Sequence, residues 1–140
     1  MAKHSVRQFM SAGPTVVSSR LTLVEAHQVM REKGIRHLPV VDEGRLVGVV
    51  SQRDLYLLET LKGVDAAREL VEEAMSGEPF TVEPEAALDE VALEMATRRH
   101  GSAVVVSGGA VVGIFTSTDA LKALVAVLRG APGARRGEPA

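Results

Sequence analysis

Apolar positions recur along the chain with two periods, one typical of helices and one typical of buried strands. A helix is predicted first, because the spacing i, i+3, i+4, i+7 of one helical face joins Leu23, Ala26, His27 and Met30. Thr22 and Glu25 have the spacing of a capping box and predict where this helix begins. His27 lies on an otherwise apolar face, so we expect it to be semi-buried with a hydrogen-bond partner.

A strand hairpin is predicted next. Two valine-rich runs, 38–41 and 46–50, flank the turn residues 42–45. Their nearly continuous apolar character is typical of strands buried on both faces. A short extended run at 15–17 precedes the first helix, and a second helix is predicted near 52–61.

The same order of elements returns 65 residues later. Residues 10–54 align without a gap on 75–119, and 13 of the 45 positions are identical. The second copy predicts an extended run at 80–82, a helical face at Leu88, Val91, Ala92 and Met95, a hairpin of 103–106 with 111–115, and a helix near 117–129. One such unit cannot cover its own apolar face, so the duplication predicts two packed repeats of class α/β (α+β).

The repeat divides the chain into three segments. We predict repeat 1 with an N-terminal segment over 1–64, and a linker helix followed by repeat 2 over 65–129. The linker helix is expected over 65–74 with Asp65 as its N-cap. The Gly- and Pro-rich residues 130–140 are expected to form a disordered tail.

Composition excludes several classes of protein. The 140 residues contain no cysteine, which excludes disulfides, thiolate zinc sites and cysteine nucleophiles. A net charge of −2, with one Tyr and three Phe, disfavours nucleic-acid binding. The four histidines lack the spacing of metal ligands. Residues 100–118 carry no charge, but Gly108-Gly109 in their middle is typical of a turn, so we predict no membrane span and a cytoplasmic protein.

The candidate chemistry lies where each hairpin meets the following helix. Ser51 and Thr116 end their strands, and Asp54 and Asp119 follow three residues later at the predicted helix starts. Unpaired amides at a helix start attract anions, and a carboxylate accepts hydrogen bonds from ribose hydroxyls. The pattern therefore suits a nucleoside phosphate.

Simpler interpretations remain open at these corners. The hydroxyl residues are equally suited to be N-caps, and the aspartates to be partners of the helix dipole. Gly48 and Gly113 fit either close approach of a ligand or tight strand packing. The run ending in His100 is either a solvated helix end or a phosphate contact. No nucleophile or metal partner accompanies either aspartate, so we expect no enzymatic activity.

The chain resembles a tandem pair of CBS domains, also called a Bateman module, as found in stand-alone CBS domain-containing proteins. The resemblance rests on the duplicated order of elements, on Leu38-Pro39-Val40-Val41-Asp42 before a turn, and on the two G-x-x-[ST]-x-x-D ends at 48–54 and 113–119. It extends from about Val6 to Leu128. It implies a flat homodimer and two clefts between the repeats. These clefts often hold AMP, ADP, ATP, S-adenosylmethionine or NAD(H) as a regulatory ligand, with no required cofactor.

The resemblance also implies which residues bind. Asp54 and Asp119 would bind the riboses, with Ser51 and Thr116 beside them. The other ligand-binding candidates are Val16, Val17, Arg36, His37, Leu38, Pro39, Arg53, Thr81, Val82, Ser102, Ala103, Val104 and Thr118.

The two repeats differ at the positions before the first hairpin strand. Repeat 1 has Arg36 and His37 where repeat 2 has Gly101 and Ser102. In this architecture one cleft takes its aspartate from one repeat and basic residues from the other. We therefore favour the Asp119 cleft, with Arg36 and His37, for a phosphorylated ligand.

The predicted function is regulatory sensing of an adenosine-containing nucleotide, with a signal to an unidentified effector protein. The alternative is a ligand-silent dimerisation or protein-interaction scaffold.

Overall fold

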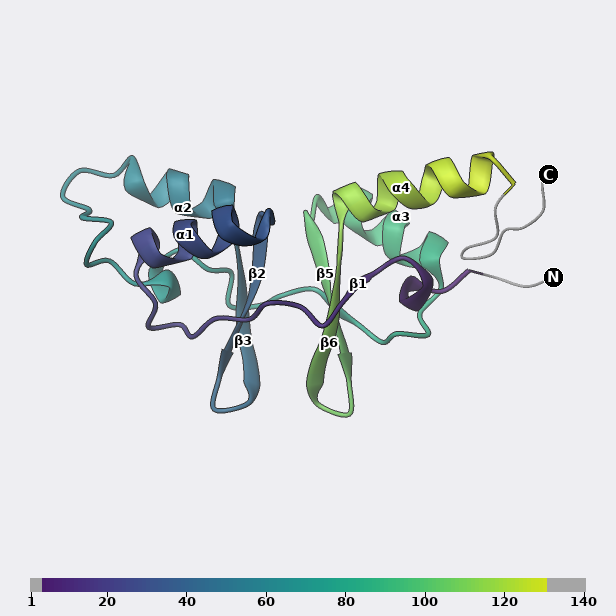
Figure 1. Ribbon diagram of the computed structural model, residues 1–140, viewed down its shortest axis with the longest axis horizontal. Coiled ribbons are helices and arrows are strands. Elements are labelled where there is room, and N and C mark those ends of the chain that lie inside the picture. Colours follow the sequence, from purple (N-terminus) through teal and green to yellow (C-terminus); the bar gives the residue numbers. More distant parts are fainter. Residues whose placement is uncertain (1–3, 131–140) are drawn as a thin grey trace. The chain divides into compact units, whose positions relative to one another are not determined.

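The computed structural model describes residues 4–130, which form two compact units (Figure 1). The first unit comprises Pro14–Pro79 and contains repeat 1. The second unit combines residues 80–130 with the N-terminal residues 4–13 and contains repeat 2. The mixed α and β composition and the two repeats agree with the sequence-based prediction. Among residues 4–130, no helix combines the length and apolar character needed to cross a membrane.

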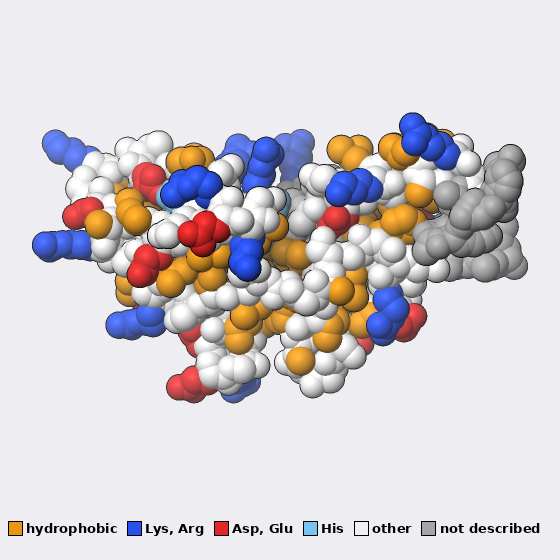
Figure 2. Space-filling view, viewed as in Figure 1, with side chains coloured by type: hydrophobic (Ala, Val, Ile, Leu, Met, Phe, Trp, Pro, Cys, Tyr) orange, Lys and Arg blue, Asp and Glu red, His pale blue; other side chains and the backbone are white. Residues whose placement is uncertain are grey.

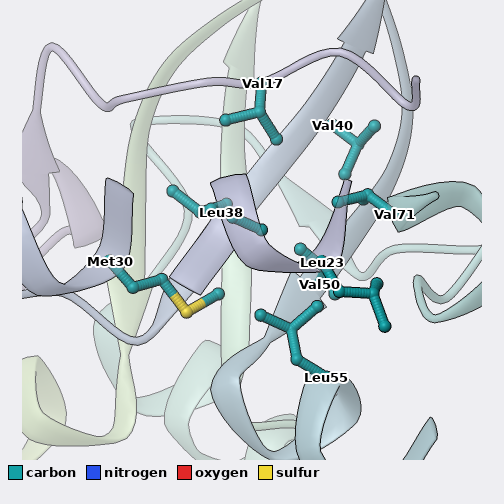
Figure 3. Packing of buried hydrophobic residues seen from close by; sticks show 9 residues of the cluster. Val17, Leu23, Met30, Leu38, Val40, Val50, Leu55 and Val71 are labelled. Atoms are coloured by element: carbon teal, nitrogen blue, oxygen red, sulfur yellow. The ribbon is translucent and has the colours of Figure 1, made fainter. Parts of the chain in front are cut away.

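The first unit packs two helices on a short sheet. Its elements are α1 (Leu23–Lys33), β2 (His37–Asp42), β3 (Arg45–Ser51), α2 (Gln52–Glu59) and a 3-10 helix (Val71–Glu73). The β2 and β3 strands are antiparallel, and single bridges from Val17 to Val40 and from Ser76 to Val49 extend the sheet on both sides. Figure 3 shows the core, whose buried side chains include Leu23, Met30, Leu38, Val40, Val50, Leu55 and Val71.

The second unit has the same plan with longer outer strands. Its elements are a 3-10 helix (Val6–Gln8), β1 (Ser11–Ala12), β4 (Thr81–Val82), α3 (Leu88–Arg98), β5 (Ser102–Ser107), β6 (Ala110–Thr116) and α4 (Ser117–Leu128). The strand order is β1-β6-β5-β4, and only β4 and β5 are parallel. Its core includes Val6, Leu88, Val91, Met95, Ala103, Val105, Phe115 and Ala123.

Local signals predicted the start of α1 correctly. The Glu25 N–H donates to Thr22 Oγ1 at 3.2 Å, and the Thr22 N–H donates to Glu25 Oε1 at 2.9 Å, which is the predicted capping box. The histidine prediction is also confirmed: the His27 side chain is 14% exposed, and its Nε2 lies 2.6 Å from Glu59 Oε2. Gly34, at φ 67°, ends α1 in the left-handed region.

The predicted linker helix over 65–74 is wrong. The segment forms turns and the 3-10 helix at Val71–Glu73. Its carbonyls are used elsewhere: Leu23 N–H donates to Glu69 O and Val24 N–H donates to Ala66 O, each at 3.0 Å. These bonds satisfy the first amides of α1 and remove carbonyls that a linker helix would use internally. Of the predicted tail, residues 131–140 lie outside the described residues.

The segment that precedes each repeat in the sequence, here called its leading segment, pairs with the sheet of the unit that contains the other repeat. Ser11 pairs with Ile114 in the second unit, and Ser76, its counterpart 65 residues later, pairs with Val49 in the first unit. The predicted boundaries, at 1–64 and 65–129, follow the repeat along the sequence. In the structure, the chain passes from the second unit into the first between residues 13 and 14, and back into the second between residues 79 and 80.

This exchange accounts for the two strand glycines. A Cβ on Gly48 would lie 2.6 Å from the Ser76 carbonyl oxygen, and one on Gly113 would lie 2.5 Å from Met10 Sδ. Of the two roles considered for these glycines, the structure supports tight strand packing.

Candidate functional site

The corner of the second unit is built around Asp119 at the start of α4. The Asp119 N–H donates to Thr116 Oγ1 at 3.3 Å, and the Thr116 N–H donates to Asp119 Oδ2 at 2.9 Å. The Thr116 hydroxyl also donates to Oδ2, at 3.1 Å. Asp119 is only 9% exposed. These contacts use one carboxylate oxygen and leave Oδ1 to accept further hydrogen bonds.

Three strand ends meet at this corner. Ser102 at the start of β5 pairs with Thr116 at the end of β6. The Ser117 N–H donates to Gly101 O at 3.1 Å, which ties the start of α4 to the start of β5. Because β4 is parallel to β5, its first residue, Thr81, lies at the same end of the sheet. The side chains of Thr81 and Thr118 are exposed there.

The corner of the first unit repeats this arrangement with Asp54 at the start of α2. The Ser51 N–H donates to Asp54 Oδ2 at 2.8 Å, and the Asp54 N–H donates to Ser51 Oγ at 3.0 Å. The Gln52 N–H donates to Arg36 O at 2.9 Å, and His37 pairs with Ser51 across the hairpin. The side chains of Arg36 and Arg53 are exposed.

The capping interpretation therefore holds at both corners. Each aspartate closes a capping box with its hydroxyl residue, and each lies in the first turn of its helix. Capping does not exclude ligand binding, because the amides of a helix start remain an anion-attracting surface and each carboxylate has a second oxygen.

The remaining candidates divide by burial. Leu38 and Ala103 are fully buried members of the two cores, and Pro39 and Val104 are also fully buried. Val17 is 9% exposed and joins the sheet of the first unit through its N–H to Pro39 O. Among these strand candidates the more accessible side chains are Val16, which is 42% exposed, and the half-buried Val82.

One polar cluster of the first unit lies at the opposite end of β2 from the corner of that unit. Asp42 Oδ2 accepts from the Ser19 hydroxyl at 2.6 Å, and Asp42 Oδ1 accepts from the Ser19 N–H at 3.0 Å. These two hydrogen bonds, with a third from the Ser18 hydroxyl and the charge of Arg20, hold the pKa of Asp42 below its ordinary value. The cluster joins the loop before α1 to the hairpin and is structural.

Sequence reasoning missed an aromatic contact at the corner of the second unit. The rings of Phe80 and His100 are stacked, with centroids 5.0 Å apart and an interplanar angle of 18°. The sequence suggests either a solvated helix end or a phosphate contact for the run ending in His100, but no pattern in it places His100 beside Phe80. Among residues 4–130, no group of three or more His, Cys, Asp or Glu residues is placed to hold a metal ion.

The family model that matches this chain is the CBS domain, and it matches twice, at residues 6–58 and 71–126. The chain is 31% identical over 116 residues to hypoxic response protein 1 of Mycobacterium tuberculosis, covering 82% of this chain and 81% of that protein. It is 32% identical over 116 residues to L-aspartate semialdehyde sulfurtransferase of Methanocaldococcus jannaschii, covering 81% of this chain. The chain spans only 22% of the length of that enzyme.

Solved structures with bound ligands share the fold. The CBS domain pair of protein MJ0100, in complex with 5′-methylthioadenosine and S-adenosyl-L-methionine, is 27% identical with a TM-score of 0.82, covering 90% of this chain and 99% of that one. CBSX2 in complex with AMP is 26% identical with a TM-score of 0.75, with the same coverage of each chain.

Proposed function

The chain belongs to the CBS domain family, and from that membership we propose that it is a regulatory module that binds an adenosine-containing ligand at its aspartate corners. The observation that carries the proposal is the duplicated corner itself. In each unit a carboxylate at a helix start uses one oxygen for capping and keeps a second oxygen for a ligand. The AMP, S-adenosylmethionine and methylthioadenosine held by the two related structures support adenosine as the common part.

Each group at the corner of the second unit has a separate task in this proposal. Asp119 accepts hydrogen bonds from the ribose hydroxyls through Oδ1. The exposed Thr118 hydroxyl and the first amides of α4 face the phosphate or another anionic group. At the corner of the first unit, Asp54 takes the role of Asp119, and the exposed Arg53 adds positive charge.

The regulatory part of the proposal requires a conformational difference. A ligand changes the behaviour of a protein only when it binds one conformation better than another. We propose that the occupied module presents a different surface to a separate effector protein, and that the module itself performs no catalysis.

A second candidate function, an interaction scaffold, is favoured by the surface of α4. Leu121, Leu124 and Leu128 on this helix are 63%, 52% and 74% exposed. Figure 2 shows hydrophobic side chains gathered over α4. Beside them, an apolar groove of about 390 Å³ lies between α3 and α4. We propose that this surface forms the homodimer, which a sensor and a scaffold would share.

The test is a thermal-melt panel with AMP, ADP, ATP, S-adenosylmethionine and NADH after removal of co-purified ligand. A ligand present at 100 times its Kd stabilises the protein by about 2.7 kcal/mol. We expect one adenosine compound to raise the Tm by several degrees and Asp119→Asn to reduce that shift.

The matched control is Glu25→Gln, which alters the capping box at the start of α1, a helix start that is not one of the two aspartate corners. It should leave the ligand-induced shift unchanged. A panel without any shift would refute the sensor and favour the scaffold.

A further inference from the structure

The walls of the apolar groove between α3 and α4 are built from small and aliphatic side chains. They include Ala92 from α3, and Ala120, Ala123 and Leu124 from α4. All four residues belong to the second unit, so the groove is a property of that unit alone. Its volume, about 390 Å³, is large enough to receive side chains from another molecule.

The first unit closes the equivalent place with its own side chains. The residues 65 positions before Ala92 and Leu124 are His27 and Glu59. The His27 Nε2 atom lies 2.6 Å from Glu59 Oε2, and the two side chains are only 14% and 26% exposed. Leu124, in contrast, is 52% exposed. The open groove is therefore not required by the fold of the repeat, and its apolar lining is available to a partner.

Projecting leucines lie beside the groove on α4. Leu121 and Leu128 are 63% and 74% exposed, and they stand three residues before and four residues after Leu124, which lines the groove. One surface thus carries both a hollow and the side chains that suit a hollow. Because a twofold axis brings the same patch of two copies together, such a surface is complementary to itself.

α3 and α4 run in opposite directions along the groove. Asp89, near the start of α3, and Val127, near the end of α4, both line it. Beyond the other end of α3, Gly101 O accepts from the N–H of Ser117, the first residue of α4, at 3.1 Å. The face formed by the two helices therefore has one end at the start of α3 and the other at the end of α3.

Opposite charges gather at these two ends. Asp89 and Glu90 are exposed in the first turn of α3, whereas Arg98 and Arg99 are exposed at its end. A twofold axis perpendicular to the face reverses the direction of the second copy. The acidic end of one copy then meets the basic end of the other, and this arrangement is electrostatically favourable.

Two other charges reduce this separation without reversing it. Arg129 follows the end of α4 and lies at the acidic end, and Glu94 pairs with Arg98 at 2.9 Å at the basic end. Two acidic residues against one basic residue leave the first end negative, and two basic residues against one acidic residue leave the second end positive. A second copy placed in parallel would bring ends of like charge together.

We propose that the second unit of one copy packs antiparallel against the second unit of another copy, with leucines of each α4 filling the groove of the partner copy. The inference rests on the homodimer of the proposed function and deepens it, because it identifies which surface of the second copy this face meets. The other available surface of the second copy is its first unit, where His27 and Glu59 close the equivalent place.

The test reverses the charge of each end in a separate variant. Variant A carries Asp89→Lys with Glu90→Lys, and variant B carries Arg98→Glu with Arg99→Glu. Alone, each variant places ends of like charge opposite each other twice, so we expect the Kd of its dimer to rise by at least about tenfold in analytical ultracentrifugation at low salt. An equimolar mixture of A and B should restore a tight dimer, because each end then meets an end of opposite charge. Native mass spectrometry identifies this species as the heterodimer.

Three measurements control the design. Glu72→Lys with Glu73→Lys changes the net charge as much as variant A does, but on the exposed 3-10 helix of the first unit, and should leave the Kd unchanged. Ala120→Leu copies Leu55 of the first unit into the groove and should weaken the dimer without any change of charge. Raising the NaCl concentration should weaken the unsubstituted dimer and tighten the dimers of A and B, which tests the charge argument even if one variant is poorly folded by circular dichroism.

The outcomes separate this inference from the proposed function. Variants A and B that dimerise as tightly as the unsubstituted protein would overturn the antiparallel arrangement, as would a mixture that forms no heterodimer. Either result leaves the adenosine-induced shift in Tm standing. An unsubstituted protein that is monomeric would overturn both the proposed homodimer and this inference.

Discussion

Replacing Gly48 with alanine tests the close approach of the exchanged segment to the hairpin of the first unit. The new Cβ would lie 2.6 Å from Ser76 O and 2.7 Å from Met75 Sδ. Ordinary contact begins near 3.4 Å, so the Ser76 backbone must retreat by about 0.8 Å (3.4 minus 2.6). That carbonyl accepts from the Val49 N–H at 3.1 Å, and the Ser76 N–H donates to Val49 O at 2.9 Å.

The expected cost follows from these contacts. A retreat of this size lengthens both hydrogen bonds beyond their usual range, and each contributes about 1 kcal/mol. Overpacking adds at least about 1 kcal/mol. We therefore expect Gly48→Ala to lower the free energy of unfolding by about 3 kcal/mol. For a chain of this length that corresponds to a fall in Tm of roughly 10 °C.

Gly113→Ala should cost less, about 1–2 kcal/mol. Its closest neighbour is the movable Met10 Sδ at 2.5 Å, whereas Ser11 O lies at 3.0 Å. The two sites should also respond differently to removal of the methionine. In double-mutant cycles, Met10→Ala should recover part of the loss in Gly113→Ala. Met75→Ala should recover little in Gly48→Ala, because the backbone oxygen of Ser76 remains in the way.

The assay is thermal and urea unfolding followed by circular dichroism. Gly77→Ala is the matched control, since a Cβ there meets no atom within 4 Å. It should be neutral or stabilise the protein by up to about 1 kcal/mol, because alanine restricts the unfolded chain. A Tm for Gly48→Ala within 2 °C of the unsubstituted protein would refute the packing argument, as would full rescue by Met75→Ala.

Three further predictions follow from local structure. Asp42 has a folded pKa below its ordinary value, so its contribution to stability is present above about pH 4 and is lost as the pH falls through the lowered pKa. When the free energy of unfolding is measured at decreasing pH, the loss of stability should therefore be less steep for Asp42→Asn. Glu43→Gln, on the exposed turn, should match the unsubstituted protein. The N-cap residue of α3 is Ala87, which provides no side-chain cap. Ala87→Thr introduces the Thr-x-x-Glu sequence that caps α1 and should raise the free energy of unfolding in urea by about 1 kcal/mol, and Thr22→Ala should lower it by a similar amount. Equal stabilities of both variants and the unsubstituted protein would contradict the capping argument. Leu124→Glu should convert the proposed dimer to folded monomer in light scattering, and Lys122→Glu on the same helix should not; a dimer that survives Leu124→Glu would exclude α4 as its interface.

The order of elements was predictable from the sequence because each repeat carries its own local signals. The capping box at Thr22 and the hairpin turn at 42–45 are short-range features that the structure confirms. The linker was not predictable in the same way. Residues 65–74 have a helical pattern in the sequence, but in the structure some of their carbonyls accept hydrogen bonds from the start of α1 instead of forming a helix. These partners lie far away in the sequence, so no local pattern indicates them.

The exchange of leading segments was hidden by the repeat itself. Met10 and Met75 occupy identical positions in the two copies, so the aligned sequences fit either pairing equally well. The candidate corners were visible because capping and ligand binding require the same residue types at the same spacing. The contact between Phe80 and His100 was not predictable, because repeat 1 has Thr15 and Ile35 at the equivalent positions. A comparison of the two copies identifies only residues that both copies share.

The second unit combines residues 4–13 with residues 80–130, and this arrangement has a consequence for folding during synthesis on the ribosome. Residues 4–13 emerge long before the strand that they join, β6, whose residues lie about a hundred positions later in the sequence. The first unit, by contrast, is complete in sequence at Pro79. Because domains generally fold as units in the order of synthesis, the first unit is expected to form while the initial segment waits for its partner. Val6, fully buried in the finished protein, stays exposed until the C-terminal half arrives. The second unit can therefore complete its sheet only after β6 has been made.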